Sequence, residues 1–277
     1  MPAVDAHGPE HVAEGPADGS RLRAQNLTLA YDRHEICRGL SLDVPDGSFT
    51  VIVGPNGCGK STLLRALARL LVPVGGAVLL DGRSLRRIAP KTAAQAIGLL
   101  PQGATTPDGI TVTELVARGR FPHRQLLRDT RAADRAAVEE AMRATGTTEL
   151  GDRVVAELSG GQRQRVWVAM ALAQETPMLL LDEPTTYLDI AHQIDLLELF
   201  AELNRQGRTM VAVLHDLNQA ARYATHLVAM RDGAVIARGA PAEVVTPQTV
   251  ADVFGLDVLV IDDPVTGTPM IVPRARI

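Results

Sequence analysis

One stretch of this chain has the residue types and the spacing of a phosphate-binding loop. It reads Gly54, Pro55, Asn56, Gly57, Cys58, Gly59, Lys60, Ser61 and Thr62. Glycines let backbone N–H groups turn inward around phosphate oxygens, and a helix that starts at the loop adds free N–H groups and a positive dipole end. Lys60 would supply a positive charge and Ser61 a hydroxyl for Mg²⁺. The plainer interpretation is a glycine-rich turn without a ligand.

The segments on either side of this loop favour the nucleotide interpretation. Residues 49–53 form a short apolar run rich in β-branched side chains, which indicates a buried strand. After the loop, leucines recur at helical spacing, which predicts a helix. These leucines are Leu63, Leu64, Leu67, Leu70 and Leu71. Strand, loop and helix follow one another as such a site requires.

A second potential anion site lies at the start of a later helix. Ser159 and Gln162 are spaced as a capping box, and Gly160 and Gly161 between them expose the backbone. The alternative is an ordinary well-capped helix. Tyr31 is also open to two interpretations, because its ring could stack on a nucleotide base or belong to the core.

Three predicted buried strands end in polar residues. Gln102 follows residues 97–100, Asp182 and Glu183 follow residues 178–181, and His215 follows residues 209–214. Ligands of open α/β sheets bind beyond the carboxyl ends of the strands, so we expect these groups to converge on one γ-phosphate. Taken singly, Gln102 could be a surface turn residue, Asp182 a helix cap and His215 a loop histidine.

Composition narrows the function. A chain of 277 residues suits one large α/β domain or a domain with an inserted lobe. A net charge of -4 and an aromatic content of 3% argue against nucleic-acid binding. Two cysteines, Cys37 and Cys58, make no disulfide framework and favour a reducing compartment. Since no apolar run approaches the roughly 20 residues that span a bilayer, any membrane role requires docking on a partner.

The predicted elements divide the chain into regions. Residues 1–20 are rich in Pro, Gly, Ala and Asp and are expected to form a disordered leader rather than a signal peptide. Residues 22–30 alternate as an exposed edge strand would, and with a strand at residues 40–44 they predict an antiparallel β lobe. Residues 103–157 are expected to form an inserted helical lobe, and residues 256–277 a β-hairpin tail.

From Leu22 to Leu256 the chain resembles the nucleotide-binding subunit of ATP-binding cassette (ABC) transporters. Three motifs carry the resemblance in the family's order and spacing: the phosphate loop, a signature at residues 158–162 and a Walker B strand at residues 179–183. The resemblance implies an α/β P-loop NTPase fold over residues 21–255. This fold combines an antiparallel β lobe, a RecA-like core and the helical lobe.

The resemblance also implies a role for each matching residue. Glu183 would be the general base for the attacking water, His215 would contact the γ-phosphate, and Lys60 with the loop amides would hold the β- and γ-phosphates of ATP. The signature of one subunit, Ser159 to Gln162, would close on the ATP of the other in a homodimer. The remaining assignments are Tyr31 stacking on adenine, Ser61, Gln102 and Asp182 arranging Mg²⁺ and its waters, and Asp189 in the loop that crosses the dimer interface.

A finer resemblance is to importers of ferric siderophores, haem and cobalamin. Residues 117–123, 184–190 and 214–220 carry it, and the tail at residues 260–273 is most similar to the siderophore branch. Tyr187 departs from the small residue that is common at its position in the wider family. The resemblance implies an ATPase at the cytoplasmic face of the cell membrane. Its partners would be permease subunits and, indirectly, an extracytoplasmic binding protein.

Three other functions are alternatives to a siderophore importer. A cobalamin or haem importer subunit is the alternative within the same class, since the cassette itself touches no transported substrate. A non-transport ABC ATPase of translation or DNA repair is the alternative from another class; one cassette, no sustained heptads and acidic charge argue against it. Intact Lys60, Asp182, Glu183 and His215 argue against a binding module without hydrolysis.

Overall fold

The computed structural model describes residues 19–274 except 33, 104–105 and 124–130. The expected leader therefore lies almost wholly outside the described residues. The strands are β1 Leu22–Tyr31, β2 His34–Val44, β3 Phe49–Val53, β4 Gly75–Leu80, β5 Arg83–Ser84, β6 Ile97–Leu100, β7 Met178–Asp182, β8 Thr209–Val213, β9 His226–Arg231, β10 Ala234–Gly239, β11 Val258–Asp262 and β12 Pro269–Pro273. The α-helices are α1 Lys60–Leu67, α2 Pro90–Ala96, α3 Val112–Arg118, α4 Arg131–Ala144, α5 Gly160–Leu172, α6 Ile190–Arg205, α7 Leu217–Tyr223, α8 Pro241–Val244 and α9 Pro247–Phe254. Short 3₁₀ helices are η1 Leu85–Arg87, η2 Phe121–His123, η3 Thr148–Leu150 and η4 Val155–Glu157.

A six-stranded sheet in the order β10-β9-β3-β8-β7-β6 forms the centre of the fold. Its strands are parallel except for β10, which closes the sheet as an antiparallel hairpin with β9. Because β3, β8, β7 and β6 are successive neighbours, the residues that follow them emerge at the same edge. The fold therefore brings together the phosphate loop and the three predicted polar strand ends.

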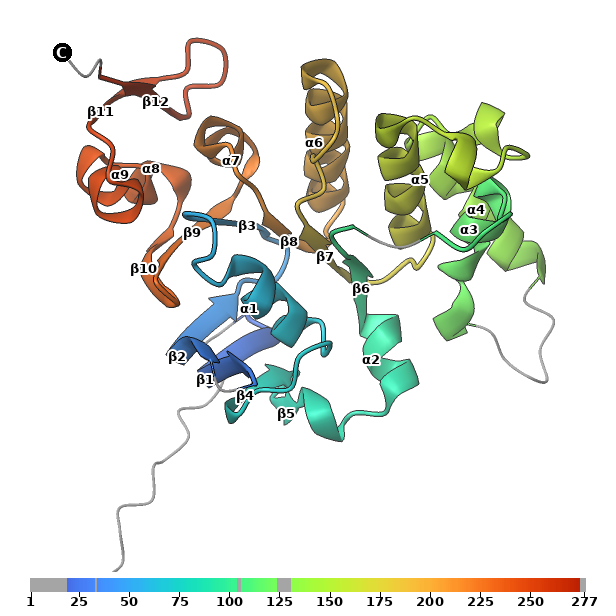
Figure 1. Cartoon of the computed structure of the whole chain (residues 1–277), viewed down its shortest axis with the longest axis horizontal. Helices are drawn as coiled ribbons and strands as arrows, with labels where there is room; N and C mark the ends of the chain where they lie inside the picture. The colour runs from blue at the N-terminus through green and yellow to red at the C-terminus, as the bar shows by residue number, and fades with distance from the viewer. Residues whose placement is uncertain (1–18, 33, 104–105, 124–130, 275–277) are drawn as a thin grey trace, which may run out of the picture.

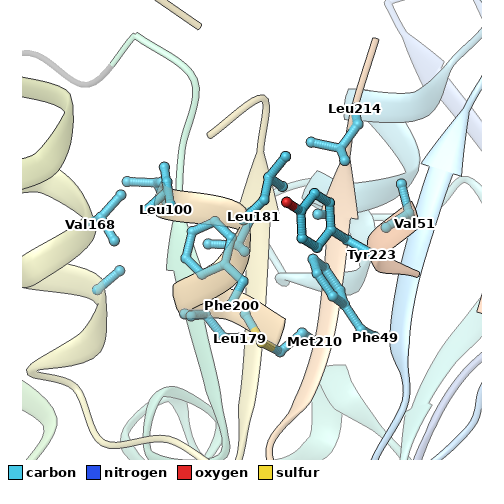
Figure 2. Packing of buried hydrophobic residues seen from close by; sticks show 14 of the residues in the cluster. Phe49, Val51, Leu100, Val168, Leu179, Leu181, Phe200, Met210, Leu214 and Tyr223 are labelled. Atoms are coloured by element: carbon cyan, nitrogen blue, oxygen red, sulfur yellow. The ribbon is translucent and has the colours of Figure 1, made fainter. Parts of the chain in front are cut away.

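Alternate residues of the central strands pack into two different cores. Val51 and Val53 of β3 belong to one cluster, and Ile52 between them belongs to the other. In the first cluster, Phe49 and Phe200 of α6 meet edge to face, with ring centroids 6.4 Å apart (Figure 2). The second cluster lies between the sheet and the β lobe and includes Leu63 of α1. Burial on both faces explains why these strands read as continuous apolar runs.

The antiparallel β lobe has the strand order β2-β1-β4-β5 and lies beneath α1 in Figure 1. The prediction that residues 22–30 form an exposed edge strand is wrong, because β1 pairs with β2 on one side and β4 on the other. The alternation reflects one buried face, and an inner strand of an antiparallel sheet shows the same pattern.

Helix α1 is shorter than its leucine spacing predicts. It ends at Leu67, Arg69 adopts a left-handed backbone with φ 65°, and Leu70 is exposed. A left-handed residue cannot continue a right-handed helix, so the spacing of Leu70 and Leu71 is a coincidence of the turn that follows.

Helices α3, α4 and α5 pack on one another beside the end of the sheet that carries β6, and the pair β11–β12 lies against α7 at the opposite end (Figure 1). Helix α3 begins with a capping box, in which the side chains of Thr111 and Glu114 each accept a hydrogen bond from the other residue's backbone N–H group. In the part of the chain that the structure describes, no helix has the length and apolar character needed to cross a membrane.

Candidate active site

The phosphate loop connects β3 to α1 and depends on glycine. Gly54, Gly57 and Gly59 have φ angles of 155°, 78° and 103°, values that side-chain-bearing residues rarely adopt. At Gly54 a Cβ would also collide with the carbonyl oxygen of Met230 on β9. The loop is thus wrapped closely around the start of α1 and leaves its backbone open to a ligand.

Lys60, the first residue of α1, is buried with its ammonium inside the loop. Its Nζ donates hydrogen bonds to the carbonyl oxygens of Gly54 and Pro55, at 2.8 and 2.9 Å. A buried ammonium needs such partners, because an unpaired charge is costly to remove from water. These two hydrogen bonds hold the positive charge of Lys60 within the phosphate loop.

Ser61 and Asp182 join the loop to the neighbouring part of the sheet. The Ser61 hydroxyl donates to Oδ1 of Asp182 at 2.7 Å, and Asp182 is only 3% exposed. Burial raises the pKa of the Asp182 carboxyl, and the Ser61 hydrogen bond opposes that shift in part. A desolvated carboxylate beside a hydroxyl is a pair of oxygen ligands that a hard cation would stabilise.

Glu183 is the centre of the second half of the site. Gln102 donates from Nε2 to one carboxylate oxygen of Glu183 at 2.6 Å, and Nε2 of His215 lies 2.7 Å from the other. Glu183 has a φ of 52°, a strained conformation for a residue with a side chain. Three successive strand ends, those of β6, β7 and β8, therefore meet at one carboxylate.

An open cleft of about 530 Å³ lies between the loop and Glu183. Its lining includes Ile36 of β2, which sequence reasoning missed because an apolar residue in a strand carries no chemical mark. The other lining residues are Asn56, Gly57, Gly59, Lys60, Ser61, Thr62, Gln102, Glu183 and His215. Cys58, also in the loop, faces the core, and burial raises the pKa of its thiol.

The other predicted site residues lie outside this lining as the structure describes it. Tyr31 is 41% exposed, so it is not a core aromatic, and its hydroxyl accepts a hydrogen bond from Arg65 of α1 at 3.4 Å. Asp189 caps α6, where it accepts from the backbone N–H of His192 at 2.9 Å and contacts that ring at 2.7 Å. The two hydrogen bonds from His192 lower the pKa of Asp189, and the charge of Arg165 acts in the same direction.

The predicted capping box at α5 is present. Ser159 Oγ accepts from the N–H of Gln162 at 3.2 Å, and Gln162 Oε1 accepts from the N–H of Ser159 at 3.1 Å. Gly160 and Gly161 lie against the loop after Glu183, where a Cβ at Gly160 would be 3.7 Å from that of Tyr187. This exposed helix start therefore adjoins the Glu183 loop without reaching the cleft of its own chain.

Comparison with known proteins places the chain in a family. A family model described as ABC transporter matches residues 37–186, which is more than half of the chain. The chain belongs to the ABC transporter family. Its fold is that of an ABC ATPase, and the fold predicted from the motifs is thereby confirmed.

Two curated relatives of this ABC ATPase span nearly its whole length. It is 58% identical to the ferric enterobactin transport ATP-binding protein FepC of Escherichia coli (strain K12), over 93% of this chain and 95% of that protein. It is 50% identical to the probable siderophore transport system ATP-binding protein YusV of Bacillus subtilis (strain 168), over 93% of this chain and 94% of that protein.

Solved structures support the same assignment. A putative metal-chelate type ABC transporter in an inward-facing conformation aligns with a TM-score of 0.79 at 28% identity, over 93% of this chain and 98% of that one. A dimeric ATP-binding cassette in a post-hydrolysis state, bound to ADP and Pi, aligns with a TM-score of 0.72 at 28% identity, over 79% of this chain and 98% of that one.

Proposed function

We propose that this chain is the ATP-hydrolysing subunit of an importer that takes up ferric siderophores. The observation that carries the proposal is the Glu183 carboxylate, which Gln102 and His215 hold at its two oxygens beside the phosphate loop. The transported substrate is proposed from the relatives, which are named for transport of ferric enterobactin and other siderophores.

The loop and Lys60 would bind the phosphates of ATP. The loop residues Asn56, Gly57, Gly59, Lys60, Ser61 and Thr62 border the cleft, and the ammonium of Lys60 is already held by two carbonyl oxygens. Phosphate oxygens would offer that ammonium stronger acceptors, because they carry negative charge and the carbonyl oxygens do not. Tyr31, exposed on the β lobe, would stack on the adenine ring.

Ser61, Asp182 and Gln102 are the residues that would hold Mg²⁺. The described residues contain no group of three His, Cys, Asp or Glu side chains that could bind a metal alone. One carboxylate and one hydroxyl suit Mg²⁺, which usually completes its shell with water and substrate phosphates. When bound, the ion would neutralise developing charge on the phosphates.

Glu183 would orient the attacking water and accept its proton. A carboxylate held at both oxygens has little freedom to turn away from a water in the cleft, so the alignment is prepared before reaction. His215, at the edge of the same cleft, would contact the γ-phosphate while its Nε2 side fixes Glu183. Phosphoryl transfer depends mainly on such positioning and on electrostatics.

A second copy of the chain would complete the site. Ser159 to Gln162 form an exposed helix start that suits an anion, yet they do not border the cleft of their own chain. A two-fold pair of chains would place each signature over the ATP of the other, with Asp189 at the crossing. A solved structure of a dimeric cassette supports this arrangement.

Transport requires partners in the membrane. We propose that permease subunits anchor the chain at the cytoplasmic face of the cell membrane and that an extracytoplasmic binding protein delivers the siderophore. Uptake of labelled ferric siderophore and labelled cobalamin in a deletion strain tests the function, with wild type or Glu183→Gln as rescue. Loss of iron uptake that only wild type restores is expected. Loss of cobalamin uptake alone would make the chain a cobalamin importer subunit, and no loss of either would refute the proposal.

A further inference from the structure

The start of α7, directly after His215, is tied to the C-terminal hairpin formed by β11 and β12. The N–H of Ile271 on β12 donates to Oδ1 of Asn218 at 2.8 Å, and Nδ2 of Asn218 donates to the carbonyl oxygen of Ile271 at 3.3 Å. In the described sheet β12 pairs only with β11, so both groups lie on its open edge. The Asn218 amide bonds that edge as a neighbouring strand would.

The same turn is fixed from two other directions. Asp216 caps α7 by accepting from the N–H of Gln219 at 2.9 Å. Gln219 in turn donates from Nε2 to Oε1 of Gln193 on α6 at 3.0 Å. Asp216 thus caps α7, Asn218 binds the hairpin, and Gln219 binds α6. All three contacts lie within four residues of His215.

An open pocket of about 240 Å³ lies beside the His215 turn and the hairpin. Its lining includes His215, Asp216 and Asn218 of the turn, Phe254 of α9, and Ile271 and Pro273 of the hairpin. Close packing would fix a side chain without hydrogen bonds, but a turn beside empty space has room to shift. The two Asn218 hydrogen bonds join the turn to the hairpin at the edge of this pocket and hold them together there.

We propose that Asn218 is a positioning residue for His215, and that the C-terminal hairpin acts through it on ATP hydrolysis. The inference rests on the proposed function, in which His215 fixes Glu183 and contacts the γ-phosphate. Without the Asn218 amide, the turn moves into the pocket and the contact of 2.7 Å between His215 and Glu183 lengthens. ATP affinity changes little, because Lys60 is the main phosphate-binding side chain and is held by separate contacts.

The test measures ATP hydrolysis and ATP affinity of the full chain. Asn218→Ala is expected to lower kcat about five- to tenfold with little change in the dissociation constant for ATP. Asn218→Asp keeps an acceptor for the N–H of Ile271 and is expected to lose less. Gln248→Ala, which removes an exposed contact to Asp252 on α9, is the matched control and should behave as wild type.

A double-mutant cycle separates positioning from general stability. If Asn218 acts through His215, then Asn218→Ala causes no further loss of hydrolysis rate in a His215→Ala background. The rate constant is measured in single turnover, with enzyme in excess. An equal loss in both backgrounds, or an unchanged kcat in the single variant, would overturn the proposal. Wild-type protein without ATPase activity would instead refute the proposed function.

Discussion

At the scale of single residues, the backbone at the end of β7 aims two neighbouring carboxylates in different directions. Asp182 ends the strand and is buried against Ser61, whereas Glu183 adopts a left-handed conformation that turns it into the cleft. A non-glycine residue held at positive φ costs roughly 1–3 kcal/mol. The fold tolerates this strain at Glu183 because Gln102 and His215 bind its side chain.

Glu183→Gln is predicted to stop hydrolysis and spare binding. Glutamine fills the same space but cannot accept a proton from water, so the hydrolysis rate should fall by about 10²- to 10⁴-fold. ATP affinity should stay within a few-fold, since the phosphate loop is untouched. Phosphate release and nucleotide titration measure the two effects. Glu202→Gln, on the exposed face of α6, is the control, and near-normal turnover of Glu183→Gln would mean that another group is the base.

The buried carboxylate of Asp182 is expected to lower the free energy of unfolding of the nucleotide-free chain at neutral pH. Burial raises its pKa above the ordinary value of 3.8, so the folded chain binds this proton more tightly than the unfolded chain. The group therefore favours folding below the unfolded pKa, and that contribution is lost as the pH rises through the folded pKa. At pH 7 the full cost of a buried charge is present.

Asp182→Asn is accordingly predicted to raise the melting temperature at pH 7 in buffer with EDTA. Each 1 kcal/mol regained should give roughly 2–4 °C, and the difference from wild type should shrink as the pH falls toward the folded pKa. Asp152→Asn, at an exposed aspartate, should show no such trend. A lower melting temperature for Asp182→Asn would mean that its bond with Ser61 outweighs desolvation.

At the scale of elements, one arginine ties the helical lobe together. Arg120, at the end of the α3 region, is 5% exposed; its Nε donates to Asp134 of α4 at 2.9 Å. Its Nη1 donates to the carbonyl oxygen of Ala173 and to Glu175 just after α5, both at 2.7 Å. The signature starts α5, so this clamp also orients the helix that would carry the signature to a partner.

Arg120→Ala is predicted to destabilise the chain by roughly 2–4 kcal/mol, because it removes a buried guanidinium together with its hydrogen bonds to Asp134, Ala173 and Glu175. Arg143→Ala, which removes an exposed pair with Glu140 on α4, should cost less than roughly 0.5 kcal/mol. Urea unfolding compares the two. Equal effects would show that the buried contacts of Arg120 contribute no more than a surface ion pair.

Elements were predicted best where pattern and chemistry agree. The strands that end in Gln102, Asp182 and His215 were expected because apolar runs end abruptly in polar residues, and the structure places all three side by side. The end of α1 was missed because Leu70 continues the helical spacing past a left-handed residue. The Asn218 contact with Ile271 could not be foreseen, since it joins a side chain to the backbone of a residue far along the chain.

At the scale of the whole molecule, two large apolar side chains lie exposed beside the signature. Tyr187 is 81% and Ile190 is 77% exposed, on either side of buried Leu188 and the helix cap Asp189. Tyr187 lies against Gly160, so this apolar pair adjoins the helix start that does not reach its own cleft. Two exposed apolar side chains beside the signature suit a contact surface, and a two-fold dimer would bury them on both copies.

Ile190→Asp is predicted to weaken the ATP-bound dimer. Removing one buried apolar side chain from each copy and adding a charge should raise the dimer dissociation constant roughly tenfold or more. Sedimentation of the Glu183→Gln chain with ATP measures dimer formation, and the specific activity of wild type should rise with protein concentration because the site needs two chains. Val265→Asp, equally exposed at the tip of the C-terminal hairpin, is the matched control. If both variants dimerise like the parent, the surface around Ile190 does not join two copies. If the specific activity is independent of protein concentration, the site does not need two chains, and the signature must meet ATP in another way.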